Sequence, residues 1–254
     1  MNGPRAPGDL FSSVSAGYAE FRPRYPRGLF DFVASIAPRR ERALECGAGS
    51  GQATLDLVEV FDHVVGTDVS ANQTARAPRH DRITWVVAAA EAAPLRSGSV
   101  DLVAVAQALH WFEFDRFFAE VRRVGSPGAV FVAWTYAAGR MDGDVGAALR
   151  RFTFETMDPY WPPQRRYVDE EYRTIPMPFE RIPTPSFELE DQWPFARLIG
   201  FMRTWSAVAQ YRKAHDDDPV AAIERELTPL WGDAEQPQRI VWPMTLIAGR
   251  IAST

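Results

Sequence analysis

The chain has almost no lysine or cysteine and no excess of positive charge. Among its 254 residues Lys213 is the only lysine and Cys46 the only cysteine, and the net charge at pH 7 is -5. A single cysteine excludes an intramolecular disulfide, and we expect Cys46 to pack as a small residue. Proteins that bind nucleic acid through its phosphates carry a basic excess or stripe, so this class is excluded. Arginine pairs such as Arg165 with Arg166 are scattered between acids and are interpreted as solvated surface charge.

Long apolar runs and metal-ligand patterns are also missing. No stretch approaches the length of a membrane span, and residues 1–9 are rich in glycine and proline without the apolar centre of a signal peptide. The four histidines form no metal-spaced pair. We therefore expect a cytoplasmic protein with no metal, no membrane partner and a small-molecule substrate, present as a monomer or a weak homodimer.

Between residues 28 and 136, apolar strands alternate with amphipathic segments. This alternation predicts an α/β fold with a parallel sheet and helices on both faces. The segment 100–107 is nearly all apolar, as is typical of a strand buried on both faces. The expected strands are 42–46, 63–68, 83–88, 100–107 and 129–136, and the expected helices are 28–37, 52–61, 70–77 and 114–124.

The alternation stops after residue 136. Residues 137–185 are rich in proline and aromatic residues, which predicts an irregular cap over the sheet and not a disordered linker. A strand at 186–190, a long helix at 194–213, a helix from Asp218 and a last strand at 239–251 follow, with a bulge expected near Pro243. The predicted organisation is one structural domain, with 28–136 and 186–254 as the core, 137–185 as the cap and 1–27 as an N-terminal segment.

The loop after the first strand carries the strongest functional signal. "LECGAGSGQ" (44–52) places three glycines at alternate positions, with Glu45 two residues before the first of them. Dinucleotide-binding loops follow G-x-G-x-x-G instead, and a pyrophosphate needs N–H donors without a neighbouring carboxylate. An acid at this position suits a ligand that carries an ammonium or sulfonium group. S-adenosylmethionine has both groups, so the pattern favours this methyl donor over NAD.

Two further acids follow the second and third strands. Asp68 ends the second strand, where a carboxylate can bind both hydroxyls of a ribose; this position fits NAD as well, so it does not discriminate. Glu91 lies in "AAAEAAPL" (88–95), which is placed to border the adenine through backbone groups. Ligands of open α/β sheets bind at the carboxyl ends of the strands, so these residues are expected at one edge.

Several stretches resemble a known family. The stretches "LECGAGSGQATLDL", "VGTDVS" and "SVDLVAVAQALHWFEFDRF" resemble those of the class I, seven-stranded S-adenosylmethionine-dependent methyltransferases. Four further stretches, "SAGYAEFRPRYP", "ALHWF", "DPYW" and "MRTWSAVAQYRK", are similar to the branch of this family that contains the fungal trans-aconitate methyltransferase. The resemblance implies a Rossmann-like, mostly parallel sheet in the order 3-2-1-4-5-7-6 with the last strand antiparallel, and S-adenosyl-L-methionine as cofactor. The implied cofactor contacts are Glu45, Gly47, Gly49, Asp68 and Glu91, to which we add their neighbours Ala48, Gly51, Val69 and Ala90.

The chemistry is expected where the fourth strand ends, beside the methyl group. Gln107 is predicted to line the methionine end of the cofactor, and Trp111 to form a wall of the substrate pocket. His110 is the candidate catalytic residue, either as a general base or as a hydrogen-bond donor that orients the substrate. A structural role, in which His110 fixes the loop by bonding to backbone, stays open.

The substrate side is predicted from arginines and aromatic residues. An anionic substrate requires cations, and arginine forks match carboxylates bidentately. The N-terminal segment, with Tyr18 and Tyr25, is expected to close over the cofactor. The predicted substrate contacts are Trp111, Arg22, Arg24, Tyr25, Tyr160, Trp161 and Arg203.

The leading hypothesis is a methyltransferase that methylates a carboxylate oxygen of a small molecule. Transfer to nitrogen, carbon or a phenolic oxygen, with His110 as base, is the alternative. A non-catalytic sensor of S-adenosylmethionine is a third hypothesis, and an NAD-dependent oxidoreductase is a disfavoured fourth. "DPYW" resembles a signature of nucleic-acid base methylation, but it lies 51 residues beyond Gln107 (158 − 107) and not at the end of the fourth strand, so that reading is rejected.

Overall fold

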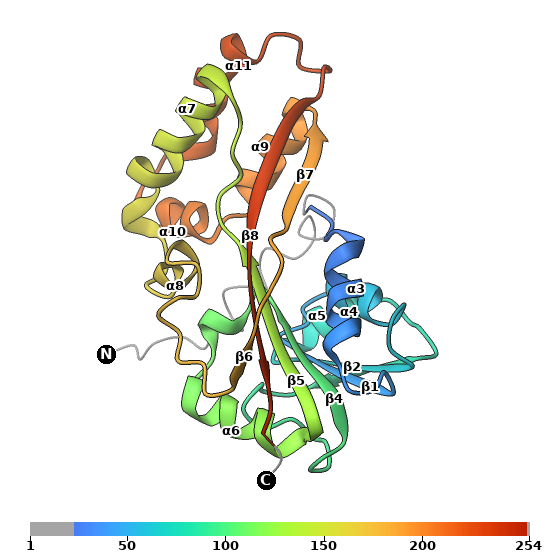
Figure 1. The fold of residues 1–254 in the computed structure, drawn as a ribbon. Helices are drawn as coiled ribbons and strands as arrows, with labels where there is room; N and C mark the ends of the chain where they lie inside the picture. Colours follow the sequence, from blue (N-terminus) through green and yellow to red (C-terminus); the bar gives the residue numbers. More distant parts are fainter. Residues whose placement is uncertain (1–22, 253–254) are drawn as a thin grey trace, which may run out of the picture.

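The computed structural model describes residues 23–252, which form an α/β fold around one mixed sheet (Figure 1). Seven strands follow the order β3-β2-β1-β4-β5-β8-β6, and β8 runs antiparallel to both of its neighbours. This order confirms the predicted arrangement, with β8 in the place of the seventh strand. The strands are β1 (Arg42–Cys46), β2 (His63–Asp68), β3 (Ile83–Val87), β4 (Val100–Ala106), β5 (Gly125–Tyr136), β6 (Glu180–Ile182) and β8 (Gln238–Arg250).

Helices cover both faces of the sheet, so the central strands are buried on two sides. Along β4, Leu102 and Ala104 join the core under α3 (Arg27–Ile36) and α4 (Gln52–Leu57). Val103 and Val105 join the core under α6 (Phe114–Val124) on the other face. This alternation is the two-residue period of a strand, and it explains why the segment reads as nearly all apolar. At the edge beyond β2, α5 (Ala71–Arg76) begins after Ser70, whose hydroxyl accepts the Gln73 N–H as predicted.

A second hydrophobic core lies beyond the sheet and forms the cap. It joins α7 (Gly143–Arg151) to α9 (Phe195–Arg203), α10 (Ser206–Ala214) and α11 (Pro219–Trp231) (Figure 1). A further strand, β7 (Glu188–Trp193), pairs with the first half of β8 and carries it into this core. Trp193 and Trp242, with ring centroids 4.6 Å apart, are fully buried there. The cap is therefore larger than predicted, because much of 186–254, assigned to the sheet core, buries its apolar faces against α7.

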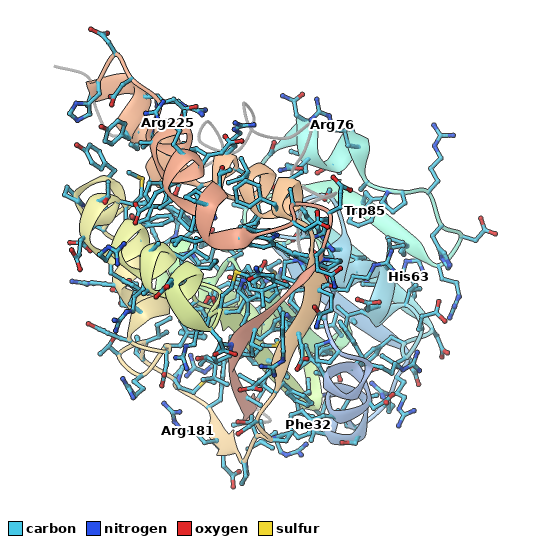
Figure 2. The ribbon with its side chains drawn as sticks, turned by 90° about the horizontal axis from the view of Figure 1, so that it is seen from above. Phe32, His63, Arg76, Trp85, Arg181 and Arg225 are labelled. Atoms are coloured by element: carbon cyan, nitrogen blue, oxygen red, sulfur yellow. The ribbon has the colours of Figure 1, made fainter. Side chains whose placement is uncertain are left out.

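The remainder of the predicted cap, up to β6, is irregular as expected. It contains a π-helical turn η2 (Phe152–Thr156), a 3-10 turn η3 (Asp158–Tyr160) and the short helix α8 (Arg165–Asp169). In the view from above, the cap side with Arg225 of α11 lies apart from the β2–β3 edge with His63 and Trp85 (Figure 2). No helix within residues 23–252 has the length and apolar character needed to cross a membrane.

One local prediction differs from the structure, and the bulge predicted near Pro243 is confirmed. The helix expected at 194–213 is broken into α9 and α10, because Trp205 adopts an extended backbone conformation and packs its indole against Phe201 and Trp161. Near Pro243 the register shifts by one residue. Three residues separate Tyr136 from Arg140, and two separate their partners Met244 and Val241. The extra residue lies on the strand facing Pro243, whose missing N–H leaves that ladder position without a donor.

Candidate active site

The carboxyl ends of four neighbouring strands bring the predicted site residues to one edge. In the parallel ladders Cys46 pairs with Thr67, and Asp68 pairs with Val87. Glu45 pairs with Ala104 of β4, so the chain leaves all four strands at the same height. The glycine loop, Asp68, the 88–91 segment and the segment after β4 therefore lie side by side, as expected for a ligand site in an open α/β sheet.

The three glycines of the loop all have left-handed backbone conformations, but they differ in their surroundings. Gly47, Gly49 and Gly51 have φ angles of 70°, 56° and 91°. A Cβ on Gly47 would lie 2.6 Å from the Ala108 Cβ, and one on Gly51 would lie 2.4 Å from the Trp85 ring. A Cβ on Gly49 would meet no atom within 4 Å. The outer glycines are required for packing, whereas Gly49 faces open space that a ligand can approach.

Asp68 holds the glycine loop in place. Its Oδ2 accepts the Gly49 N–H at 2.9 Å, and its Oδ1 accepts the Ser70 N–H at 2.8 Å. The carboxylate is half-buried and keeps part of its surface open. Next to it the Val69 side chain is 54% exposed, as is that of Val87 at the end of β3. Apolar side chains so exposed at a sheet edge offer a surface for a flat apolar group.

Glu45 is a buried carboxyl group without a cation. Only 1% of the residue is exposed, and its Oε2 accepts the Thr54 hydroxyl. Burial raises the pKa of Glu45 to about 8, with smaller contributions from Asp68 and Asp56. No basic side chain in the described part of the chain forms an ion pair with it. A carboxyl group in this state gains from any ligand that brings a positive charge.

The loop after β4 is held by a buried polar network. Gln107 has a φ of 57°, and its Oε1 accepts the Thr135 hydroxyl at 2.8 Å. His110, in the turn η1 (Leu109–Trp111), lies with its Nδ1 3.0 Å from the Tyr172 hydroxyl. Thr135 also interacts with Tyr172 and joins the two pairs. A strained backbone position within a buried polar network is typical of functional loops.

This network leaves His110 uncharged. The residue is 9% exposed, and burial lowers its pKa to about 3, with a smaller contribution from the charge of Arg165. Burial also raises the pKa of Tyr172, which stays protonated. His110 is therefore a neutral ring with little tendency to accept a proton.

Comparison with known proteins identifies the family. A model for a methyltransferase domain matches residues 44–133. The chain is 32% identical over 237 residues to a Dictyostelium discoideum protein described as a methyltransferase, covering 92% of this chain and 90% of that protein. A solved structure from Anaeromyxobacter dehalogenans, described as a type II methyltransferase, is 45% identical with a TM-score of 0.85, covering 92% of this chain and 99% of that one.

The chain belongs to the class I S-adenosylmethionine-dependent methyltransferases. The edge formed by the carboxyl ends of β1, β2, β3 and β4 also fits S-adenosylmethionine by its geometry, independently of these comparisons. Glu45 offers a buried carboxyl group to an ammonium, Gly49 leaves open space, and Val69 exposes an apolar surface beside Asp68. The narrower resemblance to the branch of the fungal trans-aconitate methyltransferase stays a prediction.

Ala90 and Glu91 of the methyltransferase lie beside this edge but differ in their surroundings. Ala90 is 5% exposed. The Glu91 Oε1 accepts the Glu113 N–H at 2.9 Å, which ties the loop after β3 to the start of α6. The Glu91 carboxylate is thereby engaged with protein backbone, and the contact of this loop with the adenine stays a prediction.

The predicted substrate residues are only partly brought together. The Trp111 ring lies tilted against the His110 ring, with ring centroids 5.1 Å apart. Tyr25 packs edge-on against Trp134 at 5.7 Å, in the core under α3. Trp161 donates its Nε1–H to the Thr153 carbonyl. Tyr18 and Arg22 lie outside the described residues.

The predicted arginines and Tyr160 lie in different surroundings, and their role in binding substrate stays a prediction. Arg203 forms an ion pair with Glu224 of α11 at 2.8 Å, with both side chains partly exposed. Arg24 is exposed. Tyr160, from the same predicted set, is hydrogen-bonded to His215 at 2.6 Å. Arg203 was expected to bind substrate because its helix is partly buried, but its own side chain points to an acid of the neighbouring helix.

Sequence reasoning missed Thr54, Thr135, Tyr172 and Arg165. Thr54 lies nine residues after Glu45, and only the turn into α4 brings its hydroxyl to the carboxylate. Tyr172 lies in an irregular stretch with no motif, 62 residues from His110. No local pattern predicts such a pairing. For Thr135 there was a local signal: the alternation of side chains along β5 indicates the face of the sheet on which Thr135 lies.

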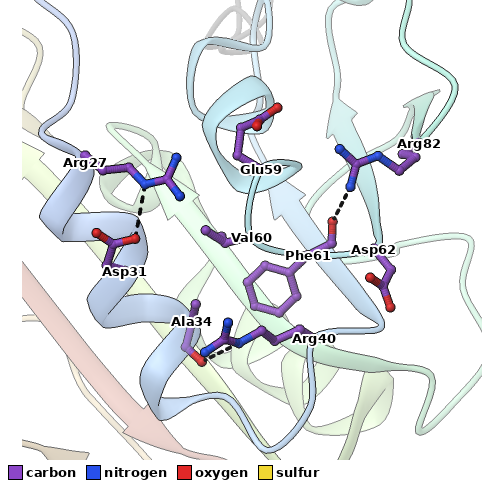
Figure 3. Close-up of a pocket in the computed structure, with 9 residues that line it drawn as sticks. All are labelled: Arg27, Asp31, Ala34, Arg40, Glu59, Val60, Phe61, Asp62 and Arg82. Atoms are coloured by element: carbon purple, nitrogen blue, oxygen red, sulfur yellow. Dashed lines mark hydrogen bonds and ion pairs between the residues drawn. The ribbon is translucent and has the colours of Figure 1, made fainter.

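A separate hollow lies at the opposite edge of the sheet. It has a volume of about 420 Å³ and is lined by Arg27, Asp31, Ala34, Arg40, Glu59, Val60, Phe61, Asp62 and Arg82 (Figure 3). These residues belong to α3 and to the turns that precede β1, β2 and β3. Its arginines already donate to protein groups, as Arg40 does to the Ala34 carbonyl and Arg82 to the Phe61 carbonyl. The hollow is thus distant in the fold from the glycine loop and is not the methyl-transfer site.

Proposed function

We propose that this methyltransferase methylates a carboxylate oxygen of a small organic acid. The residues proposed to hold the cofactor are Glu45, Gly47, Ala48, Gly49, Gly51, Asp68, Val69, Ala90, Glu91 and Gln107. Glu45 would bind the ammonium, Asp68 the ribose hydroxyls and Val69 the adenine face. When bound, S-adenosylmethionine supplies a methyl group already activated by a sulfonium, so the protein's task is to align the nucleophile and exclude water.

The observation that carries the proposal is the state of His110. With a pKa of about 3, this ring is a weak proton acceptor at neutral pH. His110 is also the only titratable side chain in the segment 107–112 that follows β4. A phenol, a protonated amine or a carbon acid must lose a proton before or during methyl transfer, whereas a carboxylic acid is already ionised. A segment after β4 without an effective base favours the nucleophile that needs none.

The role proposed for His110 is therefore orientation and not proton transfer. The Tyr172 hydroxyl at Nδ1 fixes the plane of the ring. If this hydroxyl donates to Nδ1, the Nε2 carries the proton and is a donor for a substrate oxygen. Trp111 beside it would form the wall that excludes water. Methyl transfer to nitrogen, carbon or a phenol remains the alternative and would need a base from elsewhere in the chain.

The test is turnover with defined acids. Purified protein with S-adenosylmethionine is incubated with a panel of unsaturated di- and tricarboxylic acids, with phenols and amines in parallel. Mass spectrometry should detect a gain of one methyl group on an acid, and mild base should remove it as methanol. Asp68→Ala is the control, because it should lose the cofactor and the product together.

Two results would contradict the proposal. A base-stable methylated phenol or amine, formed in place of an ester, would establish the alternative reaction. Tight binding of S-adenosylhomocysteine with no product from any acid, phenol or amine would favour a sensor of the cofactor. Cytoplasmic location, action as a monomer or weak homodimer, and the absence of nucleic-acid and membrane partners stay predictions.

A further inference from the structure

Arg165 is a partly buried arginine with an unused, buried donor atom. Its side chain is 17% exposed, and its guanidinium lies over the Trp161 ring at 4.4 Å. Its Nε donates to the Asp169 Oδ1 at 2.8 Å. Its Nη2 is buried and has no hydrogen-bond partner anywhere in the described residues. A buried charged donor without an acceptor is costly, so this atom calls for an acceptor that a ligand can supply.

The neighbouring Arg166 shows what an ordinary surface arginine looks like in the same helix. Arg166 lies over the Tyr167 ring at 4.8 Å and donates its Nη2–H to the Tyr167 hydroxyl at 2.9 Å, in an exposed position. The sequence predicts both residues to be solvated surface charge. This is correct for Arg166 and wrong for Arg165, because α8 turns only one of them towards the interior.

Arg165 lies beside the segment that follows β4. Helix α8 packs against η1, the turn that contains His110 and Trp111. The charge of Arg165 contributes to the low pKa of His110, which places the guanidinium within electrostatic reach of the ring. Tyr172, a few residues after α8, bonds His110 directly. The short stretch 161–172 thus delivers an aromatic platform, a cation and a hydroxyl to one place.

A second unused donor lies in the same network. The Gln107 Nε2 is buried without a partner among residues 23–252, while its Oε1 is engaged by Thr135. The two donors differ in charge: the amide of Gln107 is neutral and the guanidinium of Arg165 is positive. They therefore suit two different acceptors. A carboxylate held on arginine shares its charge with the guanidinium and becomes a poorer nucleophile, whereas one held by neutral donors keeps it.

We propose that Arg165 binds a carboxylate of the substrate that is not methylated, so that the substrate is a dicarboxylic or larger acid. The reacting carboxylate is oriented by the neutral donors of Gln107 and His110. This inference rests on the proposed function for the identity of the reacting group. The recognition of an anion by Arg165 does not, and it can be tested without turnover.

Methyl esters of a diacid can test the proposed contact between Arg165 and the unreacted carboxylate on its own. The monomethyl and dimethyl esters of one diacid differ by a single carboxylate, and the monomethyl ester is the expected product, with its remaining carboxylate on Arg165. Protein saturated with S-adenosylhomocysteine is titrated with both esters of fumaric, mesaconic and glutaconic acid by calorimetry. Arg165→Gln is compared with Arg166→Gln, which removes the same charge one residue away.

Wild type and Arg166→Gln should bind at least one monomethyl ester about 10- to 100-fold more tightly than its dimethyl ester, as a charge-assisted hydrogen bond provides. Arg165→Gln should bind the two esters about equally, with unchanged affinity for S-adenosylhomocysteine. Arg165→Lys, which keeps the charge without the planar fork, should retain part of the preference. The unchanged cofactor affinity shows that the variant is folded.

The inference is overturned if Arg165→Gln keeps the wild-type preference, or if wild type binds no monomethyl ester or does not prefer it. The proposed function fails separately. If the diacid is bound through Arg165 but no ester forms with S-adenosylmethionine, the anion site stands and carboxylate methylation does not. If an ester forms equally well in wild type and Arg165→Gln, carboxylate methylation stands and the role of Arg165 does not.

Discussion

The buried carboxyl group of Glu45 predicts that cofactor binding releases a proton. With a pKa of about 8, Glu45 is mostly protonated in the free protein at neutral pH. An ammonium placed against it favours the ionised form and lowers that pKa. A group with a pKa of about 8 is about nine-tenths protonated at pH 7. Binding of S-adenosylhomocysteine at pH 7 should therefore release close to one proton per site.

The same group makes the free protein less stable as the pH rises. Folding raises the Glu45 pKa from its ordinary 4.5 to about 8, so the folded state binds this proton more tightly than the unfolded chain. Its contribution to the free energy of unfolding is complete below pH 4.5 and is lost as the pH rises through 8. The loss is about 1.4 kcal/mol per pH unit within that window.

Calorimetry in buffers of different ionisation enthalpy measures the proton directly. The apparent binding enthalpy of S-adenosylhomocysteine at pH 7 should vary with the buffer in wild type and should not vary in Glu45→Gln. Urea unfolding of the free proteins at pH 6 and pH 8 should show a fall in stability for wild type that Glu45→Gln lacks. Glu45→Gln should also bind the cofactor more weakly, because an amide cannot pair with an ammonium. Buffer-independent enthalpies in wild type would refute the combination of a protonated Glu45 in the free protein and an ammonium contact in the complex.

Three further predictions concern the same edge. Asp68→Ala should weaken S-adenosylhomocysteine binding by about 100-fold, since it removes a charged acceptor and the tether of Gly49; an unchanged affinity would sink the assignment. Gly51→Ala should destabilise the fold by about 1–3 kcal/mol through its clash with Trp85, whereas Gly49→Ala should cost about 1 kcal/mol of stability and mainly reduce cofactor affinity, as chemical unfolding and titration would show. His110 should add no limb to the pH profile of kcat/KM between pH 5 and 8, because its pKa is about 3; a limb removed by His110→Gln would restore it as a base.

Most of the sheet and its edge could be predicted from the sequence because their signals are local. The apolar run of β4 predicts a buried strand, and the alternating glycines after β1 predict a ligand-binding loop, each from a few consecutive residues. The position of Asp68 at the site is likewise predicted locally, because it is the last residue of β2. Class I topology then places these segments together, since parallel strands end at a common edge.

The presence of a cap could be predicted, but its packed core could not, because the contacts of that core are distant along the chain. Its core unites α7 with β7 and three helices that follow β6, and no periodicity in either part indicates the other. The ion pair of Arg203 was missed for this reason: its partner Glu224 lies on another helix, 21 residues away. Arg165 was taken for solvated surface charge, because a pair of arginines among acids carries no sign that one of them is partly buried.

Cofactor binding and substrate choice are thus built from different kinds of structure. The cofactor edge depends on backbone positions at the ends of strands, where few side chains can be exchanged. The proposed contact with the unreacted carboxylate, Arg165, comes from 161–172, a stretch that reaches that edge at Tyr172 on His110 and at α8 on η1. Changes elsewhere in this stretch can therefore alter which acid is bound and leave the cofactor site intact, as long as Tyr172 still fixes the ring of His110.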